Sequence, residues 1–305
     1  MVFMLMVVAL LILVGIGVRS MRTVYLLKPE ENHLIGEGVY FNVFTQETRD
    51  KIKTGTIANV NEDTIFYASI QNAGKDRHMT LKAYINYRET LLEFLNTSDE
   101  DDNIYLKDGD NILIPFKIKT ELDEKTNYKM LISLFWGTDQ YEAETKFQTS
   151  MYAMSYDYLI QNDQEKNWAD INICTDINTQ YTESDFPSIV LNTDFQNSNS
   201  VKLPECELTV KAGEDFEIAY KVGHIKTDTA LLLVTIDYQQ ALVNQTEPAL
   251  IINTPQGYLA SNRISLSAPK QPGKYEICAV AVPSPAEINA FEPLENSIRF
   301  TLEVV

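Results

Sequence analysis

The apolar run from Val2 to Val18 is the feature that most constrains this chain. It reads VFMLMVVALLILVGIGV, carries no charged side chain and is followed directly by Arg19. As a helix with a rise of about 1.5 Å per residue, the run would measure roughly 25 Å, close to the ~30 Å hydrocarbon core of a bilayer. We therefore predict that residues 1–18 form a transmembrane helix that anchors the protein through residues 2–18.

A signal peptide is the alternative interpretation of the same run. Signal peptides start with a basic segment and end at a cleavage site lined by small residues. Here no Lys or Arg precedes the run, and the sequence VRSMRTV that closes it offers no such site. We favour an uncleaved anchor and, because the chain ends in an expected strand, we expect this run to be the tether.

The side of the membrane on which the body lies follows less directly from the flanking charges. Arg19, Arg22 and Lys28 all follow the run, and positive residues beside a span favour the cytoplasmic side. However, only an amino terminus precedes the span, so the comparison rests on one flank. Both orientations stay open, and the resemblance described below leads us to expect a single-pass cell-membrane protein with an extracytoplasmic body.

The rest of the chain has a globular composition. It is 45% apolar and 22% charged overall, and its 16 Tyr and 13 Phe suit strands. A net charge of −18 disfavours binding to nucleic acid or to anionic lipid head groups. We interpret the charge as promoting solubility; a cationic partner or loosely held divalent cations is the alternative.

Short apolar or alternating segments, separated by turn residues, recur from Val39 to the end of the chain. This pattern predicts an all-β fold with two tandem immunoglobulin-like β-sandwich domains after the N-terminal transmembrane helix. We expect a stem at 19–36, a first sandwich at 37–150, a linker that could hold one short helix at 151–203, and a second sandwich at 204–305.

Within this pattern, the segment MTLKAYINY at residues 79–87 alternates most clearly. Met79, Leu81 and Ala83 fall on one face, whereas Lys82 and Tyr84 fall on the other, so we expect a half-exposed strand. Residues 88–95 fit either a helical turn or a strand, and residues 141–149 are expected to close the first sandwich. In contrast, residues 230–238 are continuously apolar, as in a buried strand.

Two regions resemble a known family type. The sequence APKQPGKYEICAVAVPSP, with its Pro-Gly-x-Tyr turn, resembles the penultimate-strand region of bacterial immunoglobulin-like surface domains. The sequences ASIQNAGKDRHMTLKAYINYRE and YLKDGDNILIPFKI resemble adhesion-related sandwich modules of bacterial envelope proteins. The resemblance covers about 60 residues and implies the fold class and an extracellular setting. Cys278 departs from the Tyr-x-Cys of antibody-type domains, because it follows Tyr275 by three residues.

The three cysteines are Cys174, Cys206 and Cys278, too few for a disulfide framework. One hypothesis is a Cys206–Cys278 bridge across the second sandwich. The alternation of side chains along a strand argues against it. Cys206 lies two residues before core-facing Leu208 and so points to the same face, whereas Cys278 points away from the face that carries Ile277.

Metal and cofactor signatures are weak or absent, so no metal site and no cofactor is expected. His33, His78 and His224 are isolated from one another in the sequence. The acidic segments Asp99–Asp102 and Asp108–Asp110 could gather oxygen ligands for Ca²⁺, but they do not match the spacing of an EF-hand. We interpret both segments as solvated acidic loops.

No catalytic residue is assigned. The chain has no G-x-S-x-G, H-E-x-x-H, G-x-G-x-x-G or P-loop motif. Trp136 ends an apolar segment and is expected in a core, whereas Trp168 either packs on a domain face or is exposed for a sugar or protein. The glycosylation sequons at Asn96 and Asn244 are close to the number expected by chance.

These observations favour a non-enzymatic binding or structural protein of the cell envelope, not an enzyme. Its expected partners are the membrane, through residues 2–18, and another envelope protein or a surface glycan, but no nucleic acid. The alternatives are an accessory subunit of a transport, secretion or wall-processing system, and a hydrolase that uses carboxylates on loops.

Overall fold

A computed structural model describes residues 37–45, 55–95, 103–145, 153–162, 171, 173–183, 188–193, 207–223, 228–285 and 294–305. Among these residues, no helix combines the length and apolar character that crossing a bilayer requires. The expected transmembrane anchor at 1–18 and the expected stem at 19–36 both lie outside the described residues.

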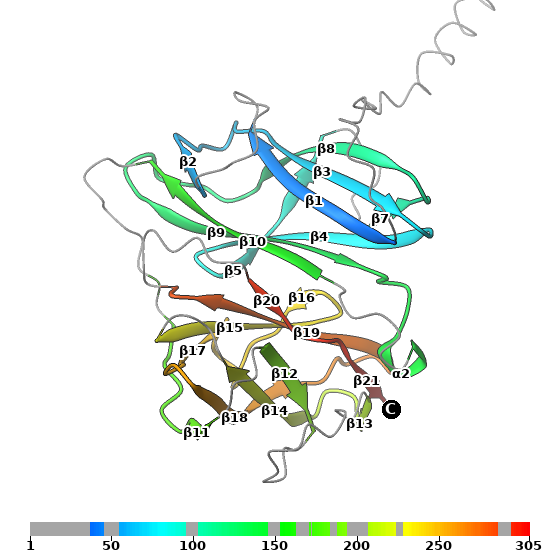
Figure 1. Ribbon diagram of the computed structural model, residues 1–305, viewed down its shortest axis with the longest axis vertical. Helices are drawn as coiled ribbons and strands as arrows, with labels where there is room; N and C mark the ends of the chain where they lie inside the picture. Colours follow the sequence, from blue (N-terminus) through cyan, green and yellow to red (C-terminus); the bar gives the residue numbers. More distant parts are fainter. Residues whose placement is uncertain are drawn as a thin grey trace, which may run out of the picture.

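The described residues are almost entirely β structure, consistent with the expected immunoglobulin-like sandwich. Their strands pair into four sheets, which we number 1 to 4. Figure 1 shows the sheets stacked as layers along the long axis, with sheet 1 uppermost and sheet 4 at the opposite end. We call sheets 1 and 2 the first sandwich and sheets 3 and 4 the second.

The first sandwich is formed by strands from the first half of the chain. Sheet 1 has the order β1 (Gly38–Thr45), β3 (Phe66–Ala73), β8 (Asn111–Ile118) and β6 (Leu92–Phe94). Sheet 2 has the order β2 (Thr56–Ala58), β10 (Ala153–Gln161), β9 (Tyr128–Trp136), β4 (Arg77–Ile85) and β5 (Arg88–Thr90), with β7 (Asn103–Leu106) also paired to β4. The β2–β10 pair is parallel. A short helix, α2 (Glu142–Thr145), lies between β9 and β10 in the sequence.

The second sandwich follows the same plan. Sheet 3 has the order β13 (Glu207–Val210), β21 (Phe300–Val304), β19 (Gly273–Pro283), β15 (Thr229–Ile236) and β16 (Gln239–Gln240), with β17 (Leu250–Asn253) on β15 and β20 (Glu295–Asn296) on β19. Sheet 4 has the order β11 (Gln180–Glu183), β18 (Tyr258–Ser267), β14 (Asp215–Gly223) and β12 (Ser188–Asn192). The β13–β21 pair is parallel.

Each sandwich encloses its own hydrophobic core. In the first, Phe66 and Phe116 of sheet 1 stack with ring centroids 5.6 Å apart and pack with Met79 and Ile132 of sheet 2. Trp136 belongs to this core, as predicted. In the second, alternate residues of the strands meet between sheets 3 and 4, and Phe300, Leu302 and Val304 of β21 share the buried face.

Sheet 2 is buried on both faces, so the expectation that residues 79–87 form a half-exposed strand is wrong. Met79 and Leu81 enter the first core as predicted, but Lys82 is only 7% exposed and Tyr84 is fully buried. The second sandwich covers the face that carries Lys82 and Tyr84, because sheet 3 packs directly against sheet 2. The polar character of that face does not indicate contact with solvent.

The expected linker at 151–203 is also corrected by the pairing of its strands. The segment with an expected short helix contains β10, which runs antiparallel to β9 along its length. Later in the same range, β11 pairs with β18 and β12 pairs with β14, so both belong to sheet 4. Consequently, strands of both sandwiches come from this range.

Two smaller expectations are settled by the structure. Residues 88–95, ambiguous in the sequence, form the strands β5 and β6. The segment 141–149, expected to close the first sandwich, begins with helix α2 and not with a strand. Its first residues turn toward the second sandwich, where the contacts described below hold them.

Candidate functional site: the joint between the sandwiches

The contact between sheets 2 and 3, which we call the joint, has an apolar centre. Tyr84 and Leu131 of the first sandwich pack with Leu231, Leu233 and Val280 of the second. A second cluster brings Phe135 against Tyr238, with ring centroids 5.3 Å apart, and against Cys278. Each Å² of apolar surface that the joint removes from water stabilises the contact by roughly 25 cal/mol. The two sandwiches are therefore in firm contact.

Helix α2 is capped by side chains of the opposite sandwich. The backbone N–H of Glu142 donates to Glu276 Oε1 at 3.0 Å, and that of Ala143 donates to Thr301 Oγ1 at 2.9 Å. The Thr301 hydroxyl in turn donates to Glu276 Oε1 at 2.5 Å. The first N–H groups of a helix lack partners within the helix and need such acceptors. The second sandwich thus completes the end of a helix that belongs to the first.

Arg299 makes a further link across the joint. Its side chain is buried, and its Nη1 donates to the carbonyl oxygen of Gly137 at 2.6 Å and to the Tyr238 hydroxyl at 2.7 Å. Its Nε lies 3.5 Å from Glu276 Oε2. Because a buried charge is tolerated only when it is paired and hydrogen-bonded, Arg299 and Glu276 depend on each other.

Polar contacts also hold the far side of the joint. The backbone N–H of Glu89 donates to Gln240 Oε1 at 2.7 Å, and that of Gln240 donates to Glu89 Oε2 at 2.5 Å. The amide Nε2 of Gln240 reaches the carbonyl oxygen of Tyr87 at 2.7 Å. Ser155 donates to Asn296 Oδ1 at 2.9 Å. These bonds join chain segments up to 153 residues apart and fix the register between the sandwiches.

Two carboxylates in the joint have strongly perturbed acidity. Burial raises the pKa of Asp157 to about 6, although Lys129 Nζ lies 3.1 Å from its Oδ2 and opposes the shift. Burial likewise raises the pKa of Glu276 to about 7, against the opposing effects of Thr301 and Arg299. The cause is the cost of placing a charge where water cannot solvate it. The closed joint thus makes ionisation of both acids less favourable than it is in water.

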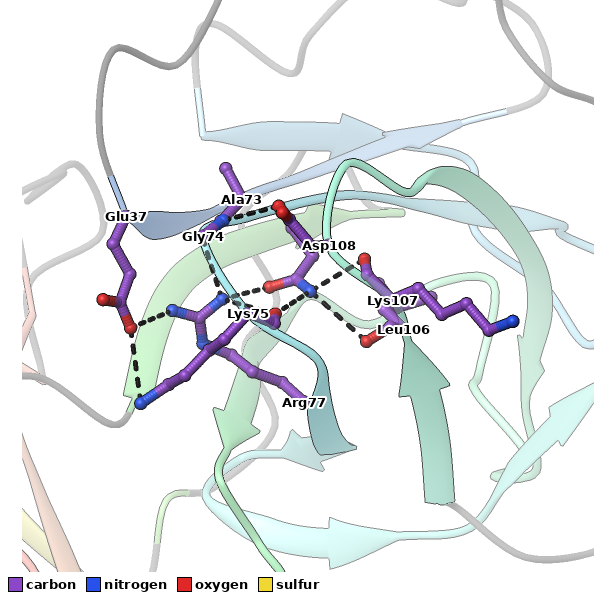
Figure 2. A network of polar contacts seen from close by, with 9 residues as sticks. Glu37, Ala73, Gly74, Lys75, Arg77, Leu106, Lys107 and Asp108 are labelled. Carbon is purple, nitrogen blue, oxygen red and sulfur yellow. Dashed lines mark hydrogen bonds and ion pairs between the residues drawn. The ribbon is translucent and has the colours of Figure 1, made fainter.

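The turns at the end of the first sandwich are fastened by a second polar network (Figure 2). The guanidinium of buried Arg77 donates to Asn72 Oδ1, to the carbonyl oxygens of Ala73 and Lys75, and to Glu37 Oε1. The Asn72 amide donates to the carbonyl oxygens of Lys75, Leu106 and Lys107. The Gly74 N–H donates to Asp108 Oδ1 at 2.7 Å. This network ties the β3–β4 turn to the β7–β8 turn.

The acidic turn at Asp108–Asp110 belongs to this network. Asp110 Oδ2 accepts from the N–H of Lys107 at 2.7 Å, and Asp76 Oδ1 accepts from the N–H of Asp108 at 3.0 Å. Over the described ranges, no group of three or more His, Cys, Asp or Glu side chains could hold a metal ion. His78 packs against the ring of Tyr105. His33, His224 and the segment Asp99–Asp102 lie outside the described residues.

The remaining residues singled out in the sequence have individual environments. Cys174 is exposed and Cys278 is buried, and both are free thiols. Cys206, Trp168 and Asn96 lie outside the described residues. Asn244 has an engaged side chain, because its Oδ1 accepts from the N–H of Ser265 at 3.1 Å.

Sheet 4 ends in an edge strand that carries exposed apolar side chains. All four residues of β11 are exposed, and β11 is the last strand on its side of sheet 4. Tyr181 on this strand is 44% exposed, and Ile177 just before it is 88% exposed. Tyr258 on the neighbouring strand is also exposed. In contrast, the opposite edge strand, β12, contacts β19 and β20.

The comparisons with known proteins give weak similarities. No protein-family model and no curated protein matches the chain. The Escherichia coli chaperone DraB has a TM-score of 0.26 and 9% identity, over 88% of this chain and 97% of that one. The C-terminal domain of the Streptococcus agalactiae AgI/II polypeptide BspA has a TM-score of 0.21 and 7% identity, over 87% of this chain and 100% of that one. The CsuC–CsuE chaperone–tip adhesion subunit complex of Acinetobacter baumannii has a TM-score of 0.24 and 10% identity, with 82% and 95% covered.

Scores this low carry no argument about what the chain does. The resemblance to bacterial envelope modules is supported at the level of an all-β, immunoglobulin-like sandwich fold.

Proposed function

We propose that this protein is a non-enzymatic binding or structural protein of the cell envelope, built of two tandem sandwich domains that act as one rigid arm. The main support for this proposal is the set of contacts between the two sandwiches at the joint. Two domains connected only by a linker would move independently, whereas these share apolar clusters and reciprocal hydrogen bonds. A rigid arm suits a protein that holds a binding surface at a fixed distance from its point of attachment.

The proposed attachment is a membrane anchor at residues 2–18, with the body on the extracytoplasmic side. The first described strand, β1, belongs to sheet 1, whereas the exposed edge of β11 belongs to sheet 4 at the opposite end of the long axis. In this arrangement the exposed edge points away from the membrane. An edge strand with accessible backbone groups and aromatic side chains can accept a strand of a partner protein.

Protease treatment of intact cells tests the location. A body on the outer face is removed by protease from intact cells, while a cytoplasmic marker stays intact. If the body survives until the cells are lysed, the extracytoplasmic location is wrong.

A second experiment tests the tether. Deleting residues 2–18 should release the folded body from the membrane fraction into the soluble fraction. Membrane association that persists in the deletion variant would contradict the proposed anchor. A variant with four of the apolar residues replaced by Ser serves as the control for chain length.

A further inference from the structure

In the joint, a titratable side chain of one sandwich caps a helix of the other. Glu276 Oε1 accepts from the Glu142 N–H and from the Thr301 hydroxyl, and the Thr301 hydroxyl oxygen accepts from the Ala143 N–H. Glu276 is 1% exposed. Opening the joint would therefore uncover a carboxylate and break both caps at once.

The groups that face Glu276 come from each element packed around it. On its own side are Arg299, the residue just before β21, together with Tyr238 and Cys278, whose acidity responds to the charge of Glu276. Asp237 donates its backbone N–H to the Glu276 carbonyl oxygen at 2.8 Å. From across the joint comes Glu142, which is itself buried. One cation and several acidic groups thus surround the Glu276 carboxylate.

A second acid occupies the opposite wall of the joint. Asp157 on β10 is buried and pairs with Lys129 of the neighbouring strand. Tyr87 and Tyr158 are near enough to respond to its charge, and β20, which carries Glu295, packs on β10. Each wall of the joint therefore contributes a buried carboxylate that already has a cation on its own sheet.

We propose that the joint is a pH-sensitive latch, in which Glu276 holds helix α2 against the second sandwich at acidic pH and loosens its hold as the pH rises through neutrality. The physical basis is the cost of desolvation. When the joint is closed, an ionised Glu276 is deprived of water, whereas in the open joint water solvates it. Ionisation therefore favours opening, and Asp157 acts in the same direction from the other wall.

The size of the effect follows from the difference in acidity between the closed and open joint. Glu276 changes from an ordinary carboxyl to one with a pKa of about 7. A difference of this size changes the opening equilibrium on the order of 100-fold between pH 4.5 and pH 8. The latch needs no ligand and does not depend on the proposed location in the envelope.

Hydrogen exchange of the unmodified protein gives the first test. The amides of Glu142 and Ala143 report opening of the joint, and the amide of Ile264, in the second core, reports unfolding of the sandwich. After correction for the intrinsic pH dependence of exchange, the protection of the two α2 amides should fall by on the order of 100-fold from pH 5 to pH 8, as the acidities predict. Ile264 should keep its protection. Protection of α2 that is independent of pH would overturn the proposal.

Cys278 provides a second and independent readout, because this buried thiol lies within the joint. The rate at which Cys278 reacts with a maleimide is measured in a C174S/C206S variant. Dividing it by the rate for the same chain unfolded in urea at the same pH removes the pH dependence of the thiol itself. The normalised rate of the otherwise unaltered protein should rise with pH.

Two variants separate a titrating latch from a merely structural contact. Glu276→Gln removes the titrating group, so the normalised rate should lose most of its pH dependence. Thr301→Val removes the cap of Ala143 and also the hydrogen bond that favours ionised Glu276, so the rate should rise and its pH dependence should be kept or become steeper. A Glu276→Gln variant that keeps the full pH dependence would also overturn the latch.

Discussion

Arg299 of the second sandwich donates a hydrogen bond of 2.6 Å to the carbonyl oxygen of Gly137 in the first. Gly137 follows the last residue of β9 and has a φ of 66°, while its own N–H donates to the carbonyl oxygen of His78 at 2.7 Å. The turn after β9 is therefore held from both sandwiches. Because Arg299 also pairs with Glu276 when that carboxyl is ionised, it is the residue on which the polar part of the joint most depends.

Arg299→Met should destabilise the protein by about 3–5 kcal/mol, the usual cost of removing one partner of a buried ion pair. The loss should be larger at pH 8 than at pH 6, because the remaining Glu276 carboxyl can be neutralised by a proton at the lower pH. Urea denaturation at the two pH values measures both effects.

The matched control is Arg263→Met. Arg263 lies 3.7 Å from Glu217 in a pair with both side chains largely exposed, 44% and 62%. Its removal should cost well under about 1 kcal/mol. Equal losses for the two variants would show that Arg299 has no special role in the joint.

Tyr84→Phe should leave stability unchanged or raise it by about 1 kcal/mol. The Tyr84 hydroxyl is buried in the joint and has no hydrogen-bond partner within the described structure. A buried hydroxyl without a partner costs free energy that phenylalanine avoids. Thermal unfolding measures the change.

Tyr220→Phe is the contrasting substitution, also at a buried tyrosine. The Tyr220 hydroxyl donates to Asp176 Oδ2 at 2.6 Å, so its removal should cost about 1–2 kcal/mol. If Tyr84→Phe and Tyr220→Phe lose the same stability, the Tyr84 hydroxyl has a hydrogen-bond partner after all.

Asp157→Asn should alter how stability depends on pH. The folded-state pKa of Asp157 is raised above the value of 3.8 in an unfolded chain, to about 6, by burial. The folded protein therefore binds the proton more tightly than the unfolded chain does. Stability from this group is fully present below about pH 4 and is lost as the pH rises to 6, on the order of 3 kcal/mol in total.

The test is the difference in unfolding free energy between wild type and Asp157→Asn, measured from pH 4 to pH 7. The common contribution of the other carboxylates cancels in this difference. Relative to the wild type, the variant should gain stability as the pH rises. A difference that stays constant over this range would mean that Asp157 titrates normally in the folded protein.

Gly74→Ala should destabilise the first sandwich by about 2 kcal/mol or more, since it combines a strained backbone with a collision. Gly74 has a φ of 99°, and an added Cβ would lie 2.9 Å from the backbone Cα of Glu37 and 2.6 Å from its Cγ. The Glu37 segment would have to move, which would weaken the contact with Arg77 shown in Figure 2.

Gly109→Ala is the control for this substitution. Gly109 has a similar positive φ of 82°, but nothing lies within 4 Å of an added Cβ. Only the backbone strain remains, so the cost should be about 1 kcal/mol. Calorimetry of both variants separates the collision from the strain, and equal costs would argue against tight packing of Glu37.

The strands could be predicted because their alternation is local. Residues 79–87 and 298–304 show which side chains of β4 and β21 share a face, and the cores use those faces. Ile298 is the exception: it is 37% exposed, since β21 begins only at Phe300. Alternation identifies the two faces of a strand but not what covers each face.

The joint could not be predicted for that reason. One face of sheet 2 carries the polar residues Lys129, Ser133 and Asp157, as a solvated face would, yet all three are buried. Their polar groups find partners within the sheet, because Lys129 pairs with Asp157 and Ser133 bonds to Ser155. A signal was present in the second sandwich. The continuous apolar run of β15 marks a strand buried on both faces, and Leu231 and Leu233 fill the joint.

The strand β10 was missed for a similar reason: its polar residues also lie on the face of sheet 2 that the joint buries. Ser155 and Asp157 alternate with Tyr156 and Tyr158, which face the first core, but the segment leads into a stretch rich in Asn, Asp and Gln. The short helix α2 could not be foreseen at all, because its caps come from Glu276 and Thr301, more than 130 residues later in the chain.

If the two sandwiches form one rigid body, as we propose, the distance between a point on each is fixed, and this distance can be measured. Spin labels at Glu62 and Gln256, two exposed positions on different sandwiches, would be introduced with Cys174 and Cys206 replaced by Ser and Cys278 by Ala. At pH 6, electron–electron double resonance should show a single narrow distance distribution. A broad distribution, as expected for domains on a flexible linker, would show that the two sandwiches do not form one rigid body.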